Sequence, residues 1–112
     1  MGMSFKVAQE GDVTVVDVEG QLIVGNRQEL KQKVLDELEE GRRKFLINFE
    51  DAGYIDSSGL GVLVSLSKKV REKGGELRLA GLNEDLRTLF ELTKLDTLFA
   101  IGNTRREVLE DF

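Results

Sequence analysis

The segment Asp56-Ser57-Ser58-Gly59 gathers two hydroxyls and a carboxylate within four residues. An apolar stretch, Phe45 to Phe49, comes shortly before it, and a helical pattern of apolar residues follows from Leu60. These polar side chains are therefore expected where a helix begins. The first backbone N–H groups of a helix have no intrahelical partners, and the helix dipole is positive there. A phosphate group would be well accommodated at such a position.

Neither serine has the neighbours that would make it a nucleophile. The chain contains no histidine and no cysteine, and activation of a serine needs an adjacent base. The Gly-x-Ser-x-Gly elbow and the phosphate-binding loop that ends in Gly-Lys-Ser are both missing. Carboxylate pairs such as Glu50-Asp51 are typical of a solvated surface. We therefore expect no catalytic residue, no metal site and no cofactor, and a hydroxyl that is a substrate for another enzyme.

A purely structural interpretation of this segment also has to be weighed. Aspartate and serine are favoured helix N-caps, and each stabilises a helix by about 1 kcal/mol. However, two serines in tandem exceed what one cap requires. Gly59 and Gly61 follow in the first turns, where each glycine costs about 1 kcal/mol relative to alanine. Leu60, Val62 and Val64 make the helix apolar on more than one face, which indicates a core face and a separate contact patch.

Composition excludes several classes of function. The 112 residues are enough for one domain with a single modest core. The net charge of −5 argues against nucleic acid as a partner, because phosphate binding needs a basic surface. No apolar run approaches the roughly 18 to 20 residues of a membrane span, and the first residues lack a secretion signal pattern. We therefore expect a cytoplasmic protein that does not act at a membrane.

Hydrophobic periodicity predicts alternating strands and helices around the Asp-Ser-Ser-Gly segment. Strands are expected over residues 5–8, 13–18, 45–49, 76–80 and 98–101. Helices are expected over 27–40 and 57–73, and from Asn83 and Thr104 onward. Asn26 is the expected N-cap of the first helix. This order predicts an α/β fold, a small mixed sheet with helices packed on it.

The stretch from Phe45 to Leu63 resembles the signature of STAS domains, and specifically of bacterial anti-sigma factor antagonists. The resemblance continues through residues 74–77 and 86–95, so it covers nearly the whole chain in order and spacing. It implies a single STAS domain over residues 1–112. The STAS fold has a mixed sheet of four or five strands, with about four helices packed on it.

The resemblance also implies a protein switch without catalysis of its own. Such an antagonist sequesters an anti-sigma factor and so frees a sigma factor for transcription. The anti-sigma factor is a serine kinase of the histidine-kinase-like ATPase type, and a PP2C-type serine phosphatase reverses its action. The kinase modifies the serine directly after the aspartate, which is Ser57 here. Asp56, Ser58 and Gly59 form the surroundings of this site, with Ser58 as a helix cap.

The expected partner-binding surface combines the loop over residues 20–26 with the start of the second helix. Many members of the family have Gly-Glu-Leu-Asp after the second strand. Here the segment reads Gly20-Gln21-Leu22-Ile23, so the loop resembles a different branch of the family. The residues expected to contact the partner are Leu22, Ile23, Val24, Asn26, Leu60, Gly61 and Val64.

Two other functions are alternatives to the switch. The first is a STAS module that is never phosphorylated and only assembles a signalling or lipid-transport complex. The second is a small nucleotide-binding or hydrolytic domain, which the missing phosphate-loop lysine disfavours. We expect a monomer, with a dimer as the alternative.

Overall fold

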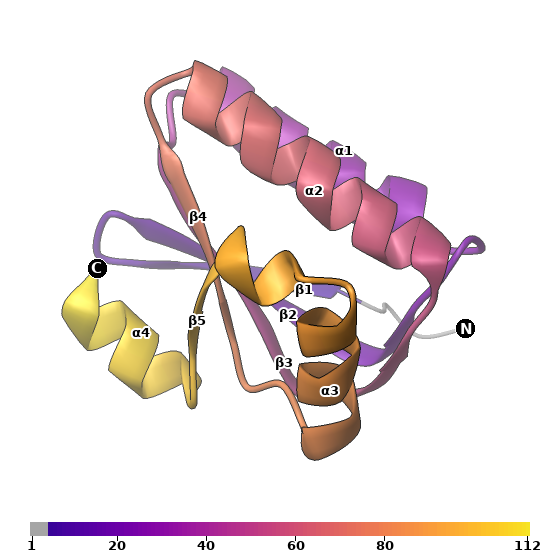
Figure 1. Ribbon diagram of the computed structural model, residues 1–112. Helices are drawn as coiled ribbons and strands as arrows, with labels where there is room; N and C mark the ends of the chain where they lie inside the picture. The colour runs from indigo at the N-terminus through magenta and orange to yellow at the C-terminus, as the bar shows by residue number, and fades with distance from the viewer. Residues whose placement is uncertain (1–4) are drawn as a thin grey trace.

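A five-stranded mixed sheet forms the centre of the protein, as seen in a computed structural model that describes residues 5–112 (Figure 1). The strands follow one another across the sheet in chain order. β1 pairs with β2 antiparallel, and the other three pairs are parallel. The mixed α/β sheet predicted from the sequence is therefore confirmed. The strands are β1 (Phe5–Glu10), β2 (Val13–Leu22), β3 (Lys44–Ile55), β4 (Glu76–Ala80) and β5 (Ala100–Gly102).

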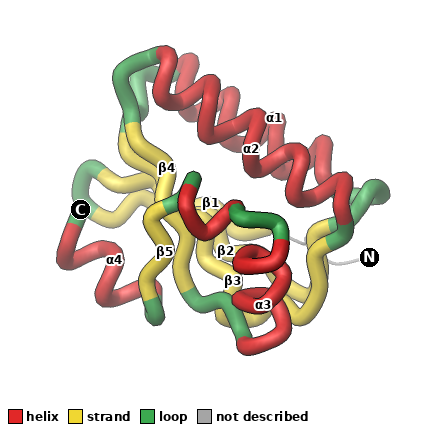
Figure 2. Tube along the Cα trace, viewed as in Figure 1, coloured by secondary structure: helices red, strands yellow, loops and turns green. Residues whose placement is uncertain are grey.

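Among residues 5–112, four α-helices cover the two faces of this sheet unequally. The long helices α1 and α2 run side by side over one face, and α3 adds to the same layer (Figures 1 and 2). The short helix α4 covers the opposite face. The helices are α1 (Arg27–Glu39), α2 (Ser57–Glu72), α3 (Glu84–Leu92) and α4 (Arg105–Asp111), with a 3₁₀ turn at Leu95–Thr97.

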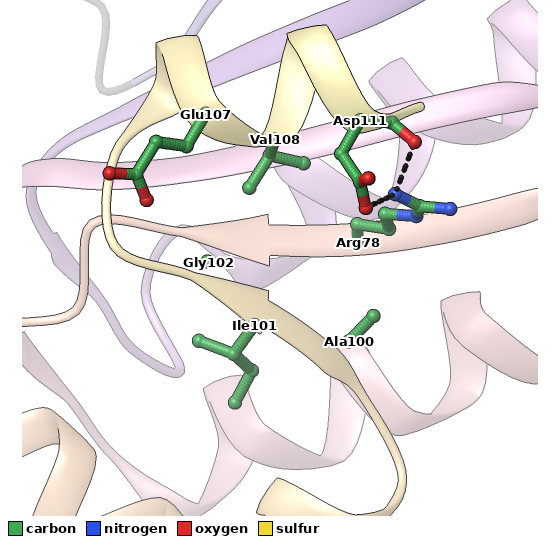
Figure 3. Close-up of a pocket in the computed structure, with 7 residues that line it drawn as sticks. All are labelled: Arg78, Ala100, Ile101, Gly102, Glu107, Val108 and Asp111. Atoms are coloured by element: carbon green, nitrogen blue, oxygen red, sulfur yellow. Dashed lines mark hydrogen bonds and ion pairs between the residues drawn. The ribbon is translucent and has the colours of Figure 1, made fainter.

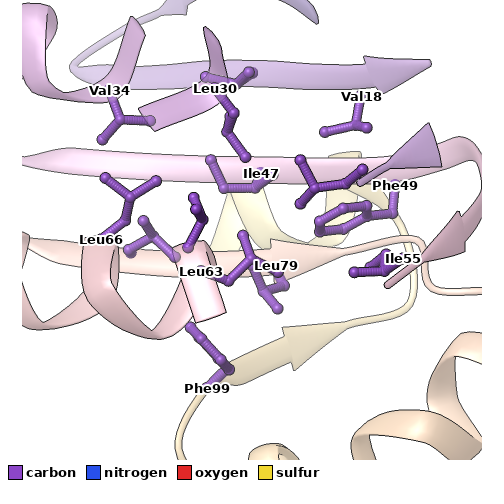
Figure 4. Packing of buried hydrophobic residues seen from close by; sticks show 14 of the residues in the cluster. Val18, Leu30, Val34, Ile47, Phe49, Ile55, Leu63, Leu66, Leu79 and Phe99 are labelled. Atoms are coloured by element: carbon purple, nitrogen blue, oxygen red, sulfur yellow. The ribbon is translucent and has the colours of Figure 1, made fainter. Parts of the chain in front are cut away.

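The main core lies between the sheet and helices α1 to α3 (Figure 4). β3 is the central strand, and all residues from Phe45 to Phe49 are buried, as their composition predicts for a strand covered on both faces. Phe45 and Ile47 point into the main core, whereas Leu46 joins the smaller cluster under α4. Alternate side chains of β3 therefore point to opposite faces of the sheet, and each face packs against its own layer of helices.

The smaller cluster depends on α4, which ends the chain. Val108 packs there on Val13, Val15, Leu46 and Ala80. Thr104 caps the helix by accepting the Glu107 N–H at 3.1 Å, as the Thr-x-x-Glu spacing predicts. At the other end of α4, the Arg78 guanidinium contacts the Asp111 carboxylate at 3.1 Å.

Strands β2 and β3 are longer than their sequence pattern predicts. β2 continues to Leu22 because Gln21 and Leu22 pair with Tyr54 and Ile55, after two irregularities in the register. The predicted loop over 20–26 is therefore wrong for residues 20–22, and only 23–26 connect β2 to α1. The extension carries this connection to the start of α2. Along residues 5–112, no helix has the length and apolar character needed to cross a membrane.

Candidate functional site

Ser57 is the first residue of α2, and its side chain is exposed. The preceding residue, Asp56, has an extended backbone and occupies the N-cap position. The N–H groups of Ser57 and Ser58 lie in the first turn, so the helix itself gives them no acceptor. The predicted hydroxyl at the mouth of a helix is therefore present in the structure.

Asp56 connects three segments through its backbone and both carboxylate oxygens. Its Oδ1 accepts the Gly59 N–H at 2.8 Å, which caps α2. Its Oδ2 accepts the Val24 N–H at 3.0 Å, which holds the β2–α1 connection against the start of α2. Its own N–H donates to the Leu22 carbonyl at 3.1 Å. The expectation that Ser58 caps the helix is wrong, because Asp56 fills that role and Ser58 is the second helical residue.

The β2–α1 connection is also held from within, by Asn26. The Asn26 Oδ1 atom accepts the Ile23 N–H at 2.9 Å, and its Nδ2 donates to the Gln21 carbonyl at 2.9 Å. Asn26 occupies the N-cap position of α1, but its side chain caps no N–H group of that helix. The predicted N-cap position of Asn26 is therefore confirmed, although both polar atoms of its amide bind the connection and leave the helix N–H groups uncapped. The loop beside Ser57 is thus pre-formed.

Apolar side chains beside this site divide into exposed and buried sets. Val24 is 62% exposed, and Ile23 and Val64 are half-buried. Leu22 has no exposed surface and Leu60 has only 8%, because both pack in the main core. The expectation that Leu22 and Leu60 line an outer patch is therefore wrong. Leu60 lies on the buried face of α2, and the pairing of Leu22 with Ile55 at the end of β2 takes the Leu22 side chain into the core.

The two glycines of α2 occupy opposite environments. A Cβ atom on Gly59 would lie 2.6 Å from the Leu22 carbonyl oxygen and 2.9 Å from the Ile55 Cγ2 atom. Gly59 therefore allows the start of α2 to pack against the end of β2. Gly61 is exposed, and a Cβ atom there would meet nothing within 4 Å. Since Gly61 is four residues after Ser57, both lie on one face of the helix.

The hydrogen bond between the Val24 N–H and Asp56 could not be predicted from the sequence. The two residues are 32 positions apart, and no local pattern relates them. Tyr54 was also missed: it is 56% exposed on the extended part of β3, directly opposite Gln21 in the register. Its position two residues before Asp56 was the only available signal.

A separate cavity of about 260 Å³ lies between β5 and α4 (Figure 3). Its only cationic side chain, Arg78, is already bound to Glu76 at 2.6 Å and to Asp111. These carboxylates, Glu76 first, raise the pKa of the Arg78 guanidinium. The cavity shares no lining residue with the Ser57 site, and we do not assign the function to it. Its lining residues are Arg78, Ala100, Ile101, Gly102, Glu107, Val108 and Asp111.

The geometry can offer a hydroxyl to another enzyme and a surface to another protein. Within residues 5–112, no group of three or more carboxylates is placed to hold a metal ion. Ser57 has no hydrogen bond to a side chain that could act as its base, among the contacts of the described residues. Asp56 is committed to two backbone N–H groups, as described above. The exposed hydroxyl and the adjoining loop therefore fit recognition and modification by another protein.

Substitutions of Asp56 should distinguish the contributions of the two hydrogen bonds that its carboxylate accepts. In Asp56→Asn the amide oxygen can still cap α2, but the NH₂ group cannot accept the Val24 N–H. We expect a loss of about 1 kcal/mol for Asp56→Asn, and about 2 kcal/mol for Asp56→Ala, which also loses the cap. Urea unfolding measures these losses, and amide hydrogen exchange locates them.

The exchange pattern provides the control for this prediction. The Val24 amide should exchange faster in both variants, and the Gly59 amide only in Asp56→Ala. Thr104→Ala, which removes the cap of α4, should accelerate neither amide. Unchanged exchange at Val24 in Asp56→Asn would show that the side chain does not hold the loop.

Comparison with known proteins gives a consistent result. The sequence model of the family described as the STAS domain matches residues 4–108. The anti-sigma-B factor antagonist of Bacillus subtilis is 34% identical over 102 residues, which cover 91% of this chain and 93% of that protein. A crystal structure of a candidate anti-sigma factor antagonist from Thermotoga maritima has a TM-score of 0.89 at 31% identity, and the match covers 96% of this chain and 92% of the other.

A more distant structure supports the fold alone. The phosphorylated form of the Bacillus protein SpoIIAA has a TM-score of 0.76 at 19% identity, over 96% of this chain and 97% of the other. Its sheet and helices follow the same arrangement as the five strands and four helices described above.

Proposed function

The chain belongs to the STAS domain family, and from that premise we propose that it is an anti-sigma factor antagonist switched by phosphorylation of Ser57. The unmodified protein binds an anti-sigma factor and thereby frees a sigma factor for transcription. The anti-sigma factor is also the serine kinase, of the histidine-kinase-like ATPase type, and a PP2C-type phosphatase removes the phosphate. The observation that carries the proposal is the exposed Ser57 hydroxyl at the entrance of α2, directly after the capping Asp56.

A phosphate on Ser57 can be accommodated within the folded domain. It adds about −1.5 to −2 charges at neutral pH. The start of α2 provides a positive dipole end and the free N–H groups of its first turn. The Asp56 carboxylate beside it opposes the new charge, although two backbone N–H groups already hold that carboxylate. We therefore infer that modification requires no refolding of the domain.

The same phosphate would act against the partner complex. The proposed contact surface consists of Val24, Ile23, Gly61 and Val64 around Ser57. Asn26 holds the loop in place through the hydrogen bond that it accepts from the Ile23 N–H. A phosphate within this surface must lose water against the partner. Burial of an uncompensated charge costs several kcal/mol. A loss of affinity of 100- to 1000-fold corresponds to only about 3 to 4 kcal/mol.

Val24 should provide much of the apolar contact. We expect Val24→Ser to leave the free energy of unfolding within about 0.5 kcal/mol of the wild type, because the side chain is exposed. Affinity for the anti-sigma factor should fall roughly tenfold or more, since a buried apolar contact contributes about 1.5 kcal/mol or more to an interface. Calorimetric titration with the anti-sigma factor measures the change.

Leu92→Ser is the matched control for this experiment. Leu92 is 78% exposed, and it lies at the end of α3, outside the proposed contact surface. The control should bind as the wild type does. Equal losses in the two variants would contradict the proposed surface.

Site-resolved phosphopeptide mass spectrometry tests the switch directly. The protein is recovered from its own cells during growth and under stress, and the proteins bound to it are identified in the same samples. The proposal expects phosphate on Ser57 whose occupancy changes with condition, and an anti-sigma factor bound only to the unmodified form. Protein that stays unmodified in a fixed complex under every condition would instead support the assembly module.

A further inference from the structure

The outer edge of β1 is an unpaired strand edge. β1 is the first strand of the sheet and pairs only with β2. Five of its six residues are exposed. Among the hydrogen bonds of residues 5–112, none joins the outer backbone groups of this strand to another segment. Such an edge is a template for pairing with a further strand.

Two common protections of an edge strand, a proline and a bulge, are absent from β1, although the strand carries charged side chains at Lys6 and Glu10. The strand contains no proline, and its register with β2 is unbroken over all six residues. A bulge or a proline would disrupt pairing of a new strand. The opposite edge of the sheet differs, because β5 has only three residues and lies between the 3₁₀ turn and α4. β1 is therefore the edge that can accept a whole strand.

The side chains of β1 favour one occupant and one register. Lys6, Ala8 and Glu10 alternate on one face of the strand, with Val7 and Gln9 on the other. If a second copy pairs antiparallel with Ala8 opposite Ala8, Lys6 of each copy faces Glu10 of the other, so two opposite-charge pairs form. A register centred on Val7 would instead place Lys6 opposite Ala8. Only the Ala8-centred pairing matches the charges.

Both charged groups are available for such contacts at the surface. Lys6 Nζ lies 3.0 Å from Glu19 Oε2 on β2, and its side chain is 67% exposed. The hydrogen bond that the Lys6 ammonium group donates to the Glu19 carboxylate raises the pKa of Lys6, so Lys6 stays cationic. Glu10 Oε2 lies 3.4 Å from Arg105 Nη2, and its side chain is 47% exposed. Each can contact a further opposite charge without giving up its present partner.

We propose that β1 is a self-association edge, at which two copies of the chain pair antiparallel about Ala8 and join their sheets. Val7, which is 39% exposed in the single chain, is covered opposite Gln9 in this pairing. The dimer uses strand β1, whereas the proposed anti-sigma factor surface uses the start of α2. Self-association therefore stands independently of the proposed function.

Sedimentation velocity over a concentration series tests the proposal. The mass should rise from 12.5 kDa toward twice that value between low micromolar and millimolar protein. Lys6→Glu should weaken the dimer roughly tenfold, because it replaces two attractive cross-strand pairs by repulsive ones. Glu10→Lys should weaken it similarly. The double variant Lys6→Glu/Glu10→Lys reverses both charges and should restore association.

Matched variants separate this mechanism from other effects. Lys68→Glu alters the net charge as Lys6→Glu does, but on the exposed face of α2, and should leave the dimer intact. Ser57→Asp should also leave it intact. Circular dichroism establishes that each variant is folded. A chain that stays monomeric throughout the series, or a double variant no stronger than the single variants, would overturn the proposal.

Discussion

Phosphorylated Ser57 is expected to lower the affinity for the anti-sigma factor by roughly 100- to 1000-fold. Ser57→Asp should lower it by at least about tenfold, since it adds one charge where phosphate adds nearly two. Ser57→Ala should bind constitutively. The reason is local: the exposed hydroxyl lies within the proposed contact surface, and a charge there must be desolvated. Titration calorimetry measures each variant against anti-sigma factor captured with the Ser57→Ala protein.

A charge control accompanies this experiment. Arg106→Gln also makes the net charge more negative by one unit, but on the exposed surface of α4, where the Arg106 side chain is 88% exposed. It should bind as the wild type does. If Ser57→Asp bound as tightly as Ser57→Ala, the phosphorylation switch would be ruled out, whereas a loss in Arg106→Gln would point to long-range repulsion.

The two glycines of α2 should respond in opposite directions to the same substitution. Gly59→Ala is expected to destabilise the domain by about 1 to 3 kcal/mol, because its Cβ would overlap the Leu22 backbone carbonyl. Gly61→Ala should stabilise the domain by up to about 1 kcal/mol, because its Cβ meets open space in a helix interior. Urea unfolding measures both changes.

Measurement of binding to the anti-sigma factor should then show why position 61 has a glycine, which makes the helix less stable than alanine would. Gly61 lies on the Ser57 face of α2, and a partner can approach the helix backbone closely there. We expect Gly61→Leu to lose anti-sigma factor binding at least tenfold while the domain stays folded. Normal binding by Gly61→Leu would remove this face of α2 from the contact surface. Gly59 allows α2 to pack against the end of β2, so its substitution should lower both the stability of the domain and its affinity for the anti-sigma factor.

Much of the architecture was predictable from residue patterns. The buried run from Phe45 to Phe49 identifies the central strand because every residue is apolar or, in one case, amide-bearing. The four-residue spacing of Leu30, Val34 and Leu38 identifies the buried face of α1. Such elements are set by local periodicity, and the structure agrees with them closely.

The limits of the candidate site could be predicted only in part. The sequence placed Ser57 at the start of a helix because strand, acidic cap and helix follow one another without interruption. It placed Leu22 on the surface, since a short apolar stretch between glycine residues gives no periodicity that separates loop from strand. The parallel pairing of Leu22 with Ile55 makes Leu22 part of strand β2, and its side chain is buried there.

The sequence by itself determined the element order, the helix start and the exposed hydroxyl, because these depend on neighbours within a few positions. Only the tertiary structure decided what surrounds the hydroxyl. The bond from the Val24 N–H to Asp56 spans 32 positions, and the contrast between Gly59 and Gly61 depends on where the end of β2 lies. Such contacts are set by strand register and helix packing, which join segments that no local pattern relates.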